Sequence, residues 1–171
     1  MKKLIAMFMC VCMSAMMMVN VQAKKKLVYN GVSYTIPSGW TYQKQGKKPY
    51  FYKGDNDGFP FFYFASGKKQ KINPKVFTKK IMVEGMQEGM KTKVYHVKAG
   101  KIGSYKGYFM DATLKVNSEK ALMRIFVFYN AKVSCLDYIN IAVEPKDKGQ
   151  LKIVNTIIKS AQLTNAKNTY K

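Results

Sequence analysis

The sequence predicts an α+β protein, a three-layer α/β/α sandwich with a mostly antiparallel central sheet and two main helices. Two predicted strands, 59–64 and 121–129, are apolar at both odd and even positions, so both faces of the sheet must be covered. Short turns join most successive strands, which favours antiparallel pairing. Two amphipathic helices supply the covering layers.

The first element is a hairpin with an Asn-Gly turn at 30–31, a pair that suits two residues with positive φ. Pro37 ends its second strand, and Ser38 and Gly39 form the next turn. Trp40, the only tryptophan, follows at once. We expect Trp40 to fold back over the end of the sheet, so Pro37, Gly39 and Trp40 are structural residues rather than a binding site.

Two aromatic strands follow, at 49–54 and 59–67, joined by the loop GDNDG. This loop resembles the start of a calcium-binding loop. Counted from Asp55, however, the template needs Gly at its sixth position and Glu at its twelfth, where this chain has Pro60 and Ser66. We therefore expect no calcium site here.

A helix is predicted from its cap at Asn73 to Met90, with Gly85 and Gly89 allowing it to lie close to a neighbour. Asp147, with Gln150 as its capping partner, starts the closing helix. Between the helices we expect four successive strands, at 92–102, 105–116, 121–129 and 133–143.

Arg124 interrupts an apolar face of the strand at 121–129. An unpaired buried charge is costly, so Arg124 lies at a sheet margin or pairs with an acid such as Asp111 or Asp137.

The pattern Ile36-Pro37-x-Gly39-Trp40, together with the order of elements from Val28 to Leu163, resembles the PsbP-like fold. That fold is shared by the extrinsic PsbP protein of photosystem II, the yeast Ran-binding nuclear import factor and many exported bacterial proteins. The resemblance implies a non-enzymatic accessory or binding module. It transfers no functional residues, because no photosystem-specific or Ran-specific motif is found.

Residues 1–23 have the pattern of a secretory signal: two lysines, an apolar run at 4–19, and Val21-Gln22-Ala23 before the predicted cleavage site. The alternative is a retained membrane anchor. Cleavage after Ala23 would send the chain to the periplasm or outside the cell. The remainder would be a single domain at 24–163 with a flexible tail at 164–171.

The net charge is +21, and removing residues 1–23 takes away two lysines and leaves +19. Every basic residue except Arg124 is lysine. One interpretation is a soluble, self-repelling surface; the other is adhesion to anionic lipid or cell-wall polymer. Nucleic acid is not expected, because arginine is almost absent. The candidate polyanion-binding residues are Lys24, Lys25, Lys26, Lys68, Lys69 and Lys71.

Catalytic chemistry is not favoured. The sequence contains no nucleophile elbow, phosphate loop or HExxH motif. Cys135 alone remains after signal cleavage, so neither an internal disulfide nor a multi-thiolate zinc site can form, and we expect no cofactor or metal. Cys135 is predicted to be a buried strand residue, and whether it meets His96 is left open.

We therefore expect an exported, non-enzymatic binding or accessory module. Its partner is an unidentified protein or an envelope polyanion, and its oligomeric state is left open. A lysine-rich protein that binds anionic lipid or wall polymer is the first alternative, and a hydrolase-type enzyme is the least favoured. A pocket that holds His96, Arg124 and a carboxylate together would favour the enzyme.

Overall fold

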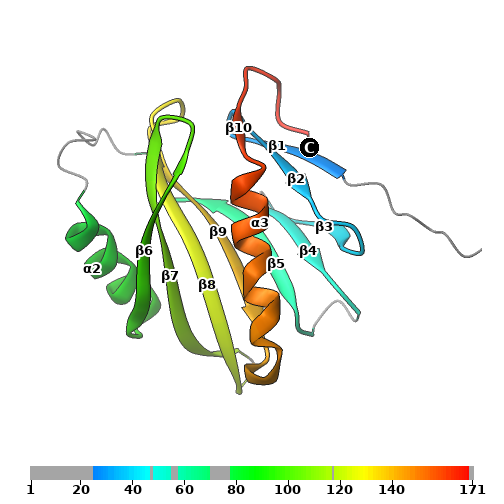
Figure 1. Ribbon diagram of the computed structural model, residues 1–171, viewed down its shortest axis with the longest axis vertical. Coiled ribbons are helices and arrows are strands. Elements are labelled where there is room, and N and C mark those ends of the chain that lie inside the picture. Colours follow the sequence, from blue (N-terminus) through cyan, green and yellow to red (C-terminus); the bar gives the residue numbers. More distant parts are fainter. Residues whose placement is uncertain (1–24, 47, 55–57, 70–77, 117, 170–171) are drawn as a thin grey trace, which may run out of the picture.

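The computed structural model describes residues 25–46, 48–54, 58–69, 78–116 and 118–169. A seven-stranded antiparallel sheet has the strand order β3-β4-β5-β9-β8-β7-β6, and a smaller sheet has the order β1-β2-β10 (Figure 1). The strands of the large sheet are β3 (Thr41–Gln45), β4 (Lys48–Tyr52), β5 (Phe61–Ser66), β6 (Val94–Ile102), β7 (Tyr105–Val116), β8 (Glu119–Asn130) and β9 (Cys135–Val143). The small sheet consists of β1 (Lys25–Tyr29), β2 (Val32–Ile36) and β10 (Gln162–Leu163). The helices are α2 (Lys79–Met90), the short 3₁₀ helix η1 (Pro145–Leu151) and α3 (Lys152–Lys159).

One face of the large sheet is covered by α3 together with the small sheet, and α3 lies across the strands in Figure 1. Apolar side chains from all three parts form one buried cluster, which includes Val32, Tyr34, Phe62, Phe126, Ile139, Val154 and Ile157. This outer layer is therefore part helix and part sheet, whereas the sequence predicted helices alone.

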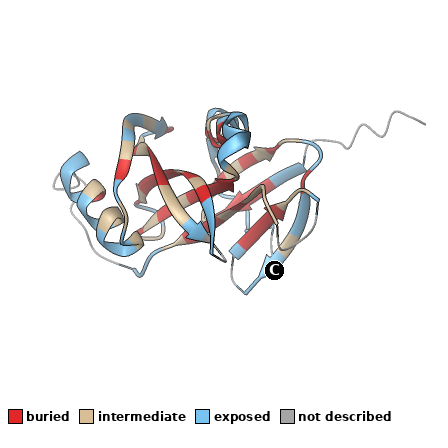
Figure 2. Cartoon of the chain, turned by 90° about the horizontal axis from the view of Figure 1, so that it is seen from below, coloured by how far each residue is buried: buried red, intermediate tan, exposed pale blue. Residues whose placement is uncertain are grey.

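The opposite face packs against α2. Met82 of α2 is buried there with a second apolar cluster that contains Met110, Ile125 and Val127 of the sheet. Phe126 of β8 belongs to the first cluster and Ile125 to the second, which explains why this strand is apolar at both parities. Figure 2 shows the buried residues along the strands, with exposed residues on the outer side of α2. The predicted α+β class and layered antiparallel architecture are confirmed.

The N-terminal hairpin forms as predicted, with φ of +50° at Asn30 and +78° at Gly31. Trp40 is 3% exposed, and its ring lies edge-on to Phe62 at 4.6 Å between centroids. The Lys53 ammonium lies 5.2 Å from the centre of the same ring. In the described part of the chain, the indole Nε1 has no hydrogen-bond partner. Trp40 is therefore part of the buried core.

Both helices begin differently from the prediction. The predicted cap Asn73 lies outside the described residues, and α2 begins at Lys79 with the Thr78 hydroxyl accepting a hydrogen bond from the Ile81 N–H. The prediction that Asp147 caps the last helix is wrong. Pro145 instead starts the 3₁₀ helix η1, and α3 begins only at Lys152.

The polar tail predicted to be flexible is described over residues 164–169, where Thr164, Asn168 and Thr169 are hydrogen-bonded to β1 or to the turn that follows it. The Thr169 N–H donates to the Val28 carbonyl at 3.2 Å, and the Val28 N–H donates to the Thr169 hydroxyl at 3.0 Å. The Asn30 N–H donates to the side-chain carbonyl of Asn168 at 2.8 Å. These contacts satisfy backbone groups of an edge strand that would otherwise need water.

Within the described ranges, no helix has the length and apolar character needed to cross a bilayer.

Candidate anion-binding pocket

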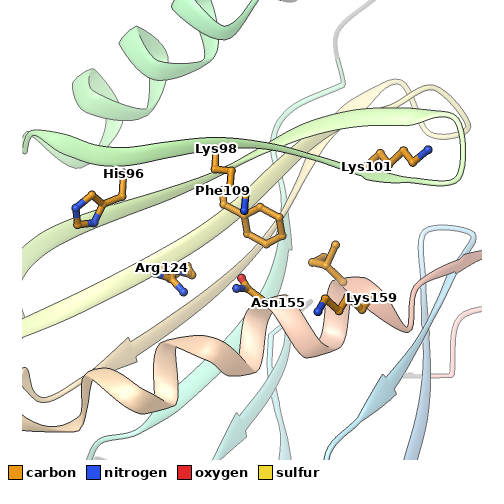
Figure 3. Close-up of a pocket in the computed structure, with 8 residues that line it drawn as sticks. His96, Lys98, Lys101, Phe109, Arg124, Asn155 and Lys159 are labelled. Atoms are coloured by element: carbon orange, nitrogen blue, oxygen red, sulfur yellow. The ribbon is translucent and has the colours of Figure 1, made fainter.

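A pocket of about 480 Å³ lies between α3 and the strands β6, β7 and β8 (Figure 3). This volume is within the usual range for small-molecule sites. Its lining combines cationic groups with an aromatic and an aliphatic wall: His96, Lys98, Lys101, Phe109, Arg124, Asn155, Ile158 and Lys159. We call it the basic pocket.

A β-bulge shapes the β6 side of the basic pocket. Tyr95 pairs with Asp111 and Lys98 with Phe109, so β6 has one residue more than β7 across this interval. His96 lies in the bulge with φ of +49°, a conformation that is uncommon for residues other than glycine. The bulge therefore turns the chain next to the pocket, where the His96 side chain is 76% exposed.

Arg124 forms an ion pair with Asp111, which is one of the alternatives that the sequence left open. The Arg124 Nε donates to one Asp111 oxygen at 2.6 Å, and Nη2 donates to the other at 2.8 Å. This hydrogen-bonded pairing with Asp111 raises the pKa of Arg124. The third nitrogen, Nη1, lies 3.5 Å from the Leu151 carbonyl. The planar fork of Arg124 is thus already occupied by a carboxylate.

Three lysines of the basic pocket have no such partner. Lys98, Lys101 and Lys159 form no ion pair with any described residue. In Figure 3, Lys98 extends from β6 toward Phe109, and Lys159 and Asn155 project from α3. Like charges gathered around a partly enclosed space produce a positive potential that attracts anions.

Two glycines make room for the aromatic wall. Gly100 and Gly107 are opposite each other on β6 and β7. A Cβ atom at Gly100 would lie 2.6 Å from the Phe109 ring, and one at Gly107 would lie 2.5 Å from the Val127 carbonyl oxygen. The Phe109 ring rests against Phe126 with 4.6 Å between centroids. The Phe109 ring is therefore held in place because β6, β7 and β8 approach one another closely at these glycines.

His96 and Arg124 line this pocket and both contact the Asp111 carboxylate behind it, which is close to the arrangement that would favour an enzyme. The His96 Nδ1 is 3.3 Å from an Asp111 oxygen. Both Asp111 oxygens, however, are bonded to Arg124, and the His96 ring lies largely in water. The lining residues also include no hydroxyl or thiol. Charge recognition is the chemistry that this arrangement supports best.

The lysines predicted from the sequence lie elsewhere. Lys25 and Lys26 are exposed at the start of β1, where they line a smaller pocket of about 200 Å³. Lys68 and Lys69 are exposed after Ser66, which is hydrogen-bonded to Asn30 at the other end of β1. The structure therefore does not bring these two pairs together, and Lys24 and Lys71 lie outside the described residues.

Nothing in the sequence marks Lys98, Lys101 and Lys159 as site residues. Lys98 and Lys101 are polar positions of a predicted strand, and Lys159 follows Asn155 by one helical turn. That spacing places Asn155 and Lys159 on one side of the helix. It contains no signal that this side faces β6.

Cys135 and His96 are far apart. Across the sheet, Tyr95 of β6 is in register with Ile141 of β9, through Asp111 and Arg124 of the strands between them. His96 directly follows Tyr95, whereas Cys135 lies at the start of β9, six residues before Ile141. This is a separation of about 20 Å along the strand direction alone. The structure thus excludes a Cys135/His96 dyad.

Cys135 instead belongs to a buried network around Asp137. Its thiol donates to Asp137 at 3.3 Å, and Asn130 and Ser66 donate to the same carboxylate at 2.7 and 2.5 Å. The Asn30 amide donates to it at 2.9 Å, which ties the hairpin turn to the large sheet. Burial and the nearby Asp137 charge raise the pKa of Cys135 to about 12, so its thiol is protonated at neutral pH.

Among the residues that the structure describes, no three His, Cys, Asp or Glu side chains are grouped so that they could hold a metal ion.

Comparison with known proteins shows the fold. No protein-family model matches the sequence, and no curated protein matches it significantly. Solved structures do match. Cyanobacterial PsbP from Synechocystis sp. PCC 6803 has a TM-score of 0.57 at 11% identity, over 85% of this chain and 95% of that one.

The chain has the PsbP-like fold. Two further structures with the PsbP-like fold match it. LpqN of Mycobacterium tuberculosis has a TM-score of 0.59 at 11% identity, over 78% of this chain and 83% of that one. The Ran-binding protein Mog1p of Saccharomyces cerevisiae has a TM-score of 0.53 at 9% identity, over 82% and 96%.

Proposed function

We propose that this chain is an exported, non-enzymatic binding module that holds an anionic ligand in the basic pocket. The observation that carries the proposal is the set of three lysines without ion-pair partners among the described residues, which surround a pocket with an apolar wall. A chain with 30 basic and nine acidic residues also attracts anions over longer distances.

Two proteins with the PsbP-like fold support an accessory or binding role. LpqN is involved in cell envelope biogenesis, and Mog1p is a Ran-binding protein. The signal-like pattern of residues 1–23 supports export, with the described domain acting outside the cytoplasm.

Calorimetric titration with inorganic pyrophosphate tests the proposal. Lys98→Gln combined with Lys159→Gln removes two charges from the basic pocket, and we expect an affinity at least about tenfold lower, equivalent to ~1.4 kcal/mol. Lys68→Gln combined with Lys69→Gln removes the same charge from a remote exposed segment and is the matched control. Equal losses in both variants would assign binding to general surface charge. Failure of the wild-type protein to bind pyrophosphate at millimolar concentration would also refute the proposal.

Adhesion of the surface lysines to envelope polyanions is a second candidate, favoured by the exposure of Lys25, Lys26, Lys68 and Lys69. Because these residues lie outside the basic pocket, both activities can exist on one molecule and be tested separately.

A further inference from the structure

We infer that the ligand of the basic pocket is a phosphate ester of a compact apolar alcohol that carries a ring. This inference rests on the proposed function and narrows it from anions in general to one chemical class. It follows from the donors that are still free and from the wall that they face.

The state of Arg124 argues against a carboxylate ligand. Arginine recognises carboxylates through two parallel N–H···O bonds, and Arg124 already makes that pair with Asp111, at 2.6 and 2.8 Å. The cations that remain in the basic pocket are lysines, which act as point charges and bind phosphate well. A second carboxylate would find no free planar fork.

The free donors also approach from several directions. Lys98 comes from β6, and Lys159 and the Asn155 amide come from α3 (Figure 3). A tetrahedral phosphate presents acceptor oxygens in several directions and carries up to about two negative charges near neutral pH. It can therefore meet donors from both elements at once, whereas a planar group meets fewer.

The apolar part of the ligand follows from Phe109 and Ile158. Their side chains line the same pocket as the lysines, and Phe109 is held in place against Phe126. A ring placed on Phe109 would gain aromatic contact, and its apolar surface would be removed from water. A volume of about 480 Å³ fits a ligand of small-molecule size rather than a lipid with two acyl chains.

Four probes separate the parts of this ligand in calorimetric titration: 1-naphthyl phosphate, 1-naphthoate, inorganic phosphate and 1-naphthol. We expect 1-naphthyl phosphate to bind at least about tenfold more tightly than each of the others. The Phe109→Leu variant should lose several-fold affinity for 1-naphthyl phosphate and keep its affinity for pyrophosphate. Unchanged circular dichroism and unfolding midpoint would show that this variant is folded.

The outcomes distinguish this inference from the proposed function. Equal or tighter binding of 1-naphthoate would overturn the phosphate assignment, and equal binding of inorganic phosphate would overturn the apolar part, while anion binding would still stand. If no probe bound and pyrophosphate also failed, both ideas would fall together.

Vesicles test the source of the phosphate. We expect sedimentation with phosphatidate-containing phosphatidylcholine vesicles to be unaffected by Lys98→Gln combined with Lys159→Gln. Loss of sedimentation in that variant, with no binding of 1-naphthyl phosphate by the wild type, would assign the phosphate to a lipid headgroup and overturn the compact ligand.

Discussion

Arg124 shows how a single residue sets the chemistry of a pocket. It is the only arginine of the chain, and Asp111 neutralises it on the sheet face that also packs against α3. The Asp111 side chain is 6% exposed and that of Arg124 is 21% exposed. Removing one member of such a pair leaves a poorly hydrated charge without a partner.

The Asp111→Asn substitution should therefore lower the free energy of unfolding by about 2–3 kcal/mol, slightly less than for a fully buried pair because Arg124 reaches water. Urea unfolding at pH 7 measures this loss. Glu84→Gln is the control, since Glu84 and Lys80 form an exposed pair at 3.9 Å and should contribute less than about 0.5 kcal/mol. Equal effects of the two substitutions would mean that the Arg124 pair is no stronger than a surface pair.

Ionisation of the Cys135 thiol makes the free energy of unfolding depend on pH in the alkaline range. Its pKa is about 12 in the folded protein and about 9 in its ordinary state, because burial and Asp137 disfavour the thiolate. The folded state therefore holds this proton more tightly than the unfolded state does. The resulting stabilisation is complete below pH 9 and is lost as the pH rises toward 12.

We expect the stability difference between the wild-type protein and Cys135→Ala to be constant below pH 9 and to shift against the wild type above it. Urea unfolding of both proteins between pH 7 and 11 measures this difference, and comparing them cancels the titration of the shared lysines. Burial also raises the pKa of Tyr34 and Tyr138, which are present in both proteins. A difference that stayed constant up to pH 11 would contradict the assignment.

At the scale of elements, α2 is the least tightly packed covering layer. Met82 is its only buried residue, and no described neighbour lies within 4 Å of where a Cβ atom would be at Gly85 or Gly89. Among the described residues, therefore, no neighbour packs closely against these glycines. Their effect on α2 is the helix-weakening effect of glycine itself.

Gly85→Ala and Gly89→Ala should each stabilise the protein by up to about 1 kcal/mol, because alanine favours the helix and meets no obstacle. The shift in urea midpoint measures this gain. Gly107→Ala provides the contrast: its Cβ would lie 2.5 Å from the Val127 carbonyl oxygen, so we expect a loss. A loss in the two α2 variants would indicate a contact to these positions from outside the described residues.

At the scale of the whole molecule, the charge of +21 is spread over separate surfaces. Lys25 and Lys26 lie at one end of β1, and Lys68 and Lys69 lie near the other. Attraction of such exposed charges to a polyanion is screened by salt, with a Debye length of about 8 Å at physiological ionic strength.

A chain that lacks residues 1–23 should therefore be retained on phosphatidylglycerol vesicles or isolated wall polymer at low salt and released at high salt. Reversal of charge at the six predicted lysines should abolish retention, whereas Lys98→Gln combined with Lys159→Gln should leave most of it. Cosedimentation measures both effects. Retention that survives charge reversal and high salt would rule out this electrostatic adhesion.

Local patterns explain which parts of the fold could be predicted. The Asn30-Gly31 turn and the double-sided strand β8 are encoded by neighbouring residues. The cost of an unpaired charge indicated an acidic partner for Arg124 but did not choose between Asp111 and Asp137. The basic pocket had no such signal. Lys98 and Lys159 line one pocket only because α3 packs over the face of the sheet near β6, and the bulge at His96 contains no glycine that would mark it.

The tail contacts have a consequence for the connectivity of the chain. Thr169 lies across from Val28, three residues from Lys25, so both ends of the described chain occupy one edge of the small sheet (Figure 1). Joining them with a short linker and opening the exposed turn at Gly103-Ser104 would rearrange the order of the sequence without rearranging its strands. A protein fused to either end of the described chain would therefore project from the same place, beside β1.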